Sequence, residues 1–134
     1  MERWKEVFAG VIPKAVYQMQ LINGEEHGLI IKLSSSHTCV VINFGVVQAV
    51  RMIDEGIVQN YLYSENEVER HKCNHFQNVI FEVKDGEFAE QINRISCGMG
   101  EVLDLKHYIL ITQNYNVDII ADSEPTILIS KNDR

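Results

Sequence analysis

The chain has 134 residues, of which 46% are hydrophobic and 23% charged, and this balance excludes a disordered or low-complexity protein. Its length predicts a single domain over residues 1–134, with a core large enough to fold without disulfides. The formal net charge of −7 argues against nucleic-acid binding, because an acidic surface repels phosphate backbones.

The cysteines and the hydropathy pattern indicate the cellular setting. Cys39, Cys73 and Cys97 are widely spaced and odd in number, which favours a reduced, cytoplasmic protein over a disulfide framework. No apolar run approaches the length of about 18 residues that a bilayer-spanning helix needs, so we expect no membrane segment. No motif indicates a cofactor, and none is expected.

The N-terminal half is predicted to begin with a helix and continue in strands. Trp4, Val7 and Phe8 have helical spacing before Gly10, which predicts a short helix that docks on the core. The alternation over residues 15–33, with "NGEEHG" between two apolar runs, predicts a β-hairpin. The apolar run from residue 39 to 53 predicts a central strand that is bent or bulged at Gly45.

The C-terminal half predicts a strand, a helix and a second hairpin. A strand at residues 79–83 precedes a helix with Asp85 as its N-cap, Phe88 on its apolar face and Gly98 as its stop. Residues 107–121 predict a hairpin, and residues 126–130 predict an edge strand after Pro125. These elements together predict an α+β fold, with one antiparallel or mixed sheet and two or three helices packed on it.

The segment "RHKCNH" raises the question of metal or thiol chemistry. His71, Cys73 and His75 alternate, so an extended segment would place them on one side, where imidazole and thiolate are good zinc ligands. A second ligand cluster is missing, although His107 or Cys97 could complete a site through folding. A polar loop with incidental histidines is the favoured interpretation, and no metal is expected.

Asp118 interrupts an otherwise apolar strand. An unpaired carboxylate in the core is costly, so Asp118 is expected either to face water or to have a partner such as Arg51.

An acidic, tyrosine-containing region predicts a protein-binding surface. Tyrosines are common at interface centres, and carboxylates attract a basic partner. The alternative is an ordinary polar surface with half-buried tyrosines. The predicted partner-binding residues are Tyr61, Tyr63, Glu65, Glu67, Glu69 and Tyr115.

Two stretches, "FGVVQAVRMIDEG" at 44–56 and "HYILITQNYNVDIIADSEP" at 107–125, resemble small bacterial proteins associated with the immunity proteins of polymorphic toxin systems. The resemblance covers about a quarter of the chain and implies a non-enzymatic α+β protein that binds and blocks a cognate toxin.

Three hypotheses of function follow. The favoured one is a non-catalytic protein-binding domain that takes a basic protein partner. The second is a small metal- or thiol-dependent enzyme that uses His71, Cys73 and His75. The third is a structural homo-oligomer, in which an exposed strand edge from the final hairpin pairs with its twin.

Overall fold

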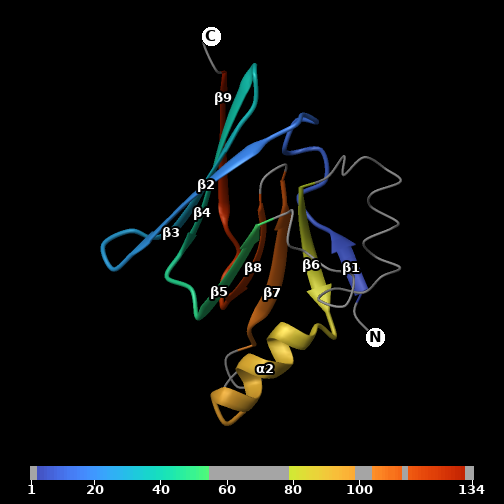
Figure 1. Cartoon of the computed structure of the whole chain (residues 1–134), viewed down its shortest axis with the longest axis vertical. Coiled ribbons are helices and arrows are strands. Elements are labelled where there is room, and N and C mark those ends of the chain that lie inside the picture. The colour runs from blue at the N-terminus through green and yellow to red at the C-terminus, as the bar shows by residue number, and fades with distance from the viewer. Residues whose placement is uncertain (1–2, 55–78, 99–103, 113–114, 132–134) are drawn as a thin grey trace.

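A computed structural model describes residues 3–54, 79–98, 104–112 and 115–131 of the chain. Within these residues the chain forms nine strands and one helix, and the strands make two antiparallel sheets (Figure 1). The strands are β1 (Arg3–Glu6), β2 (Gln18–Gly24), β3 (Gly28–Ser34), β4 (Thr38–Gly45), β5 (Ala49–Asp54), β6 (Ile80–Lys84), β7 (Lys106–Ile111), β8 (Tyr115–Ala121) and β9 (Thr126–Lys131); the helix is α2 (Glu87–Ile95).

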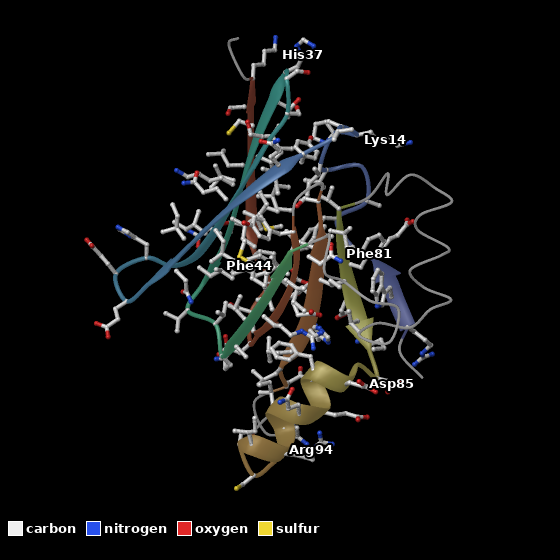
Figure 2. The ribbon with its side chains drawn as sticks, in the orientation of Figure 1. Lys14, His37, Phe44, Phe81, Asp85 and Arg94 are labelled. Carbon is white, nitrogen blue, oxygen red and sulfur yellow. The ribbon has the colours of Figure 1, made fainter. Side chains whose placement is uncertain are left out.

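The prediction of an α+β fold with a single sheet was wrong. Sheet A has the strand order β1-β6-β7-β8-β5 and sheet B the order β2-β3-β4-β9, so the described chain is mostly β. In the same residues α2 is the one helix, and it lies at one end of the molecule, whereas the turn between β3 and β4 lies at the other (Figures 1 and 2). That helix is too short to cross a bilayer.

The predicted N-terminal helix is instead strand β1. Trp4 pairs with Val83 of β6, is 5% exposed, and its ring centroid lies 5.6 Å from that of Phe81. Burial of this indole against sheet A outweighs the local helical spacing, which is only a weak preference. Phe8 then has a φ of +55°, which is incompatible with a continuing right-handed helix.

The core lies between the two sheets. Alternate residues of each strand face inward, and one cluster of buried side chains includes members of both sheets. Phe44 of sheet B, labelled in Figure 2, lies between the sheets, and its ring centroid is 5.7 Å from that of Tyr108 of sheet A. Other members of this cluster are Leu29, Ile31, Leu33, Ile42, Leu110, Val117 and Ile119.

The run from residue 39 to 53 is two strands rather than one. A bend at Gly45 is confirmed: this residue has a φ of +68°, and its N–H donates to Asn43 Oδ1 at 2.8 Å. The register shifts there, because Ile30 is opposite Asn43 while Leu29 is opposite Gly45, which is a β-bulge. The chain then leaves sheet B and enters sheet A as β5, since the run is too long for one ordinary strand.

The two predicted hairpins, the strand at 79–83 and the final edge strand are confirmed. Strands β2 and β3 pair from Gln18 to Gly24, and strands β7 and β8 pair with His107 opposite Ile120. Strand β9 pairs with β4 at the end of the sheet B order. However, β7 and β8 lie inside sheet A, so the hairpin does not provide the free edge that the homo-oligomer hypothesis required.

Helix α2 is confirmed, but its predicted N-cap is wrong. Gly86 occupies the N-cap position, while Asp85 has a φ of +59° and accepts a hydrogen bond from Arg3 at 3.2 Å (Figure 2). The helix ends as predicted, because Gly98 has a φ of +88° and its N–H donates to Asn93 O at 2.8 Å.

Candidate functional site

Three polar side chains from three strands meet on the face of sheet A that points away from sheet B. Arg51 of β5 is directly opposite Asp118 of β8, and His107 of β7 is one diagonal position away, opposite Ile120. Because strand side chains alternate, this register places all three on one face, outside the core between the sheets.

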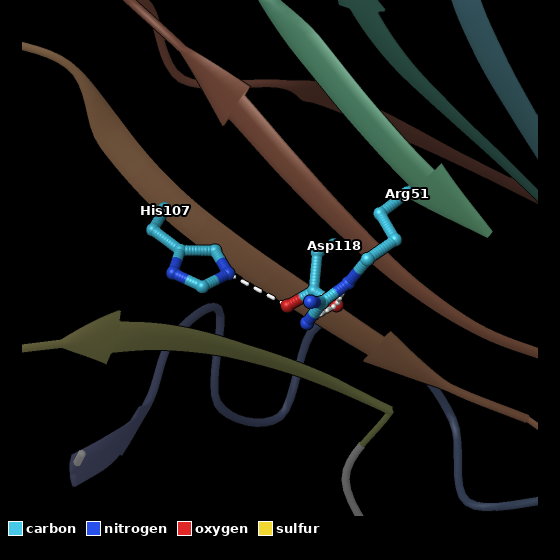
Figure 3. A network of polar contacts seen from close by, with 3 residues as sticks. All are labelled: Arg51, His107 and Asp118. Carbon is cyan, nitrogen blue, oxygen red and sulfur yellow. Dashed lines mark hydrogen bonds and ion pairs between the residues drawn. The ribbon is translucent and has the colours of Figure 1, made fainter. Parts of the chain in front are cut away.

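Asp118 is the centre of this network. Its Oδ2 accepts hydrogen bonds from Arg51 Nη2 at 2.8 Å and Nε at 3.1 Å, while its Oδ1 lies 2.7 Å from His107 Nε2 (Figure 3). The carboxylate is 0% exposed, and the Arg51 side chain is 26% exposed. Of the two alternatives expected for Asp118, exposure to water or a partner such as Arg51, the structure shows the second.

Helix α2 closes the network from one side. The Phe88 ring lies under the guanidinium of Arg51, with Cζ 4.7 Å from the ring centroid, and meets the His107 ring edge-on at 5.8 Å. Gly86 lies directly against the imidazole, since a β-carbon there would be 2.8 Å from His107 Nδ1. The chain has glycine at this position because no larger residue fits.

The contact with Asp118 also orients the His107 ring. A carboxylate accepts hydrogen bonds only, so Nε2 is the donor in this contact. Nδ1 is buried and has no hydrogen-bond partner among the described residues.

Among the described residues, this network links three strands of sheet A through Asp118. The nitrogen of His107 that does not contact Asp118 lies against Gly86. Within the described residues no group of three histidine, cysteine or carboxylate side chains is placed to hold a metal. Cys97, which could have completed a metal site, is exposed beyond the end of α2.

A small hollow lies beside α2. It has a volume of about 220 Å³ and is lined by the polar residues Asp85, Glu90 and Asn93 and by apolar residues that include Ile92 and Ile120. Pockets for drug-sized ligands and cofactors have volumes of about 300–1,000 Å³. The hollow is smaller than such pockets, and Asp85 in its lining is already paired with Arg3.

The most distinctive surface is the face of sheet B that points away from sheet A, here called the outer face. The strand registers place its residues in three rows of four across the sheet, and none of them is buried. Row by row they are Ile22, Ile30, Asn43 and Thr126; Gln20, Lys32, Val41 and Leu128; and Gln18, Ser34, Cys39 and Ser130.

The outer face is nearly free of charge. Lys32 is the one charged residue at these twelve described positions, although 23% of the chain is charged and charged residues prefer solvent-facing positions. Ile22 is 45% exposed and Leu128 is 70% exposed, on the same face as the half-buried Ile30 and Val41. Exposed apolar side chains that gather on one face are typical of an interaction surface.

Acidic residues flank the outer face at one end. Glu25 and Glu26 lie in the turn between β2 and β3, and Asp122 and Glu124 lie in the connection into β9; all four are exposed. Because the strands are antiparallel, both segments reach the end of sheet B where Ile22 and its row lie. The outer face thus combines exposed apolar side chains with an acidic rim at one end, and many protein interfaces likewise have a polar rim.

Most of the residues predicted to bind a partner or a metal lie outside the described residues. This applies to Tyr61, Tyr63, Glu65, Glu67 and Glu69, and to His71, Cys73 and His75. Tyr115 is described: it begins β8, is half-buried, and packs against the core cluster between the sheets.

The sequence analysis did not identify the outer face or the role of His107. The alternation of Gln18, Gln20 and Ile22 with Met19 and Leu21 contained a signal for a solvent face in β2. The position of His107 beside Asp118 depends on the hairpin register, which residue types alone do not fix.

Comparisons of the chain with protein-family models, with curated proteins and with solved structures gave no match.

Proposed function

We propose that this chain is a non-catalytic protein-binding domain that docks a basic protein partner on the outer face of sheet B. The observation that carries the proposal is the composition of this face, with exposed Ile22 and Leu128 and a single charge, Lys32, in a chain of net charge −7. A solvent-facing sheet surface needs no exposed leucine or isoleucine for folding, whereas an interface gains affinity from burying them.

The acidic rim gives the partner its expected charge. Glu25, Glu26, Asp122 and Glu124 attract a basic surface before contact, which raises the association rate. Apolar side chains then provide affinity once water is displaced. The binding therefore combines steering by the rim with burial of the exposed apolar side chains of the face.

Neutralisation of a toxin is the biological role that we assign to this binding, within the cytoplasm. It is supported by the resemblance of residues 44–56 and 107–125 to immunity proteins. The mechanism is occlusion, in which the bound chain covers the active surface of its partner.

The test is an affinity capture with the tagged full chain as bait, at low and high salt, followed by binding measurements with the purified partner. Ile22→Lys adds charge beside the acidic end of the face, and Ile95→Lys is the matched control because Ile95 is 69% exposed beyond this face, at the end of α2. We expect one stoichiometric basic partner to bind the wild type and the control, and to be lost with Ile22→Lys. Equal binding by both variants, or no partner at either salt, contradicts the proposal.

Charge-reversal variants test two acidic regions separately: the rim at Glu25 and Glu26, and the predicted site that contains Glu65, Glu67 and Glu69. Glu25→Lys with Glu26→Lys is expected to slow association at low salt, with a much smaller effect at high salt, because salt screens exposed charges. The predicted site at Tyr61, Tyr63, Glu65, Glu67 and Glu69 has its own test. If charge reversal of the three glutamates leaves association unchanged, that region takes no part in binding.

A further inference from the structure

The free edge of β9 lacks the features that normally prevent edge strands from pairing with each other. In the part of the chain that the structure describes, β9 pairs with β4, and its other side is the edge of sheet B. An edge strand presents unpaired N–H and C=O groups, which proteins usually protect with charges, proline or bulges. From Thr126 to Ser130 the strand has none of these, and Leu128 and Ile129 are 70% and 40% exposed.

The edges of the two sheets differ in charge. In sheet A, the edge strand β1 carries Arg3, Lys5 and Glu6, and the edge strand β5 carries Arg51. In sheet B, the other edge strand, β2, is uncharged like residues 126–130 of β9, and its Ile22 is 45% exposed. Both described edges of sheet B therefore lack protecting charges, and the order of side chains distinguishes β9 from β2.

The first five residues of β9 form a chemical palindrome. They read Thr126, Ile127, Leu128, Ile129, Ser130, so similar residue types repeat in reverse order around Leu128, and Lys131 follows as the last residue of the strand. We propose that two copies of this chain pair through β9 in antiparallel orientation, about a two-fold axis at Leu128 perpendicular to the sheet.

This register is the best of those that the sheet allows. It places Leu128 opposite Leu128 of the second copy, Ile127 opposite Ile129, and Thr126 opposite Ser130, so that like residues meet. A shift by one residue would oppose side chains from different faces of the sheet. A shift that centres the axis on Ile129 would oppose Ile127 with Lys131 and Leu128 with Ser130.

Charges at both ends of the paired strands are complementary. Two chains of net charge −7 repel each other, so their contact must avoid acidic residues or neutralise them. In the proposed register Lys131 lies opposite Pro125 of the second copy, next to its exposed Glu124. Each end of the interface therefore brings a lysine close to a glutamate of the other chain.

The strength and the consequence of the contact follow from its geometry. A five-residue edge buries less than the roughly 1,200 Å² of a stable interface, so we expect a reversible dimer. The two-fold axis keeps both outer faces on the same side and joins two four-stranded sheets into one of eight strands. The pairing of two β9 edges does not depend on the proposed function. That the dimer would present two outer faces to a partner does rest on the proposed function.

The test is sedimentation velocity on the full chain from about 1 µM to about 1 mM, a range that covers weak to moderate dissociation constants. The wild type is expected to shift from monomer towards dimer as its concentration rises. Leu128→Lys and Leu128→Glu are each expected to stay monomeric, because two like charges would face each other across the axis. An equimolar mixture of the two variants is expected to regain the dimer, since only a residue that faces itself is rescued in this way.

Three outcomes would overturn the proposal: a wild type that stays monomeric up to about 1 mM, a dimer that persists in both Leu128 variants, or a mixture that fails to dimerise. Val46→Lys is the matched control, because Val46 is 72% exposed and lies between β4 and β5. The Ile22→Lys variant separates the two proposals, since it is expected to lose the basic partner and keep the dimer. An Ile22→Lys chain that still binds the partner contradicts the proposed function, and one that no longer dimerises contradicts the pairing through β9.

Discussion

Removal of Arg51 tests whether the buried network holds sheet A together. Asp118 is 0% exposed and receives two hydrogen bonds from Arg51, so Arg51→Met removes both of these bonds and the cation that they hold against a buried carboxylate. Breaking a buried ion pair costs about 3–5 kcal/mol. Because the Arg51 side chain is 26% exposed, water can partly replace it, and we expect the lower end, about 3 kcal/mol.

This loss is large enough to measure by thermal or urea unfolding. For 134 residues the entropy of unfolding at the midpoint is about 0.28 kcal/mol/K, so about 3 kcal/mol lowers Tm by about 11 °C. Arg51→Lys is the informative intermediate. It keeps the charge but loses the paired hydrogen bonds and the planar contact with Phe88, so its expected cost lies between those of wild type and Arg51→Met.

A double-mutant cycle measures the interaction energy between Arg51 and Asp118 apart from the other effects of each substitution. Asp118→Leu removes the carboxylate, and the double variant Arg51→Met/Asp118→Leu removes both charges and leaves apolar side chains of similar size. The double variant is expected to cost less than the sum of the single variants by about 1–3 kcal/mol. A cost below about 1 kcal/mol for Arg51→Met, or a coupling within about 0.5 kcal/mol of zero, would refute the stabilising role.

Three further predictions concern other described or predicted sites. Burial, together with the nearby Glu124 and Glu82, raises the pKa of Tyr108 from 10.0 to about 12. The folded state therefore holds this proton more tightly than the unfolded state does. The free energy of unfolding should fall as pH rises from 10 towards 12. Tyr108→Phe should remove this alkaline loss and the last tyrosine component in a titration followed by absorbance, and an unchanged titration would contradict the assignment. Gly86→Ala should lower the free energy of unfolding in urea by about 1–3 kcal/mol, because the new β-carbon would lie 2.8 Å from His107 Nδ1. Gly24→Ala is the control and should be nearly neutral, because a β-carbon there would have no atom within 4 Å. Equal costs for the two variants would show that the close contact does not matter. Elemental analysis of protein purified without a metal-binding tag should find less than about a tenth of an equivalent of zinc, and a full equivalent would revive the site at His71, Cys73 and His75.

Local patterns predicted the hairpins well because they depend on nearby residues. The alternation at 15–33 and 107–121 was enough to place β2 with β3 and β7 with β8. The pairing of Arg51 with Asp118 was also predictable, because the cost of a buried carboxylate demands a partner and few cations were near.

The fold class was not predictable, because it depends on contacts between distant segments. Trp4 has helical neighbours, yet it pairs with Val83, which is 79 residues away in the chain. The apolar run around Gly45 could not show that its halves belong to different sheets, since a continuous strand and a crossing between sheets have the same composition. The sequence also could not show that β7 and β8 lie inside sheet A, and the homo-oligomer hypothesis therefore began with the wrong edge.

The faces of sheet A and sheet B that point away from the core have different roles: the one on sheet A contributes to stability, and the one on sheet B to the proposed binding. On sheet A this face is buried, and its charges at Arg51 and Asp118 are already paired. It could meet a partner only if that packing were opened. On sheet B the outer face exposes Ile22 and Leu128 without any gain to the folded chain. Substitutions in the network should therefore lower stability with unchanged affinity per folded molecule, and substitutions on the outer face should lower affinity at unchanged stability.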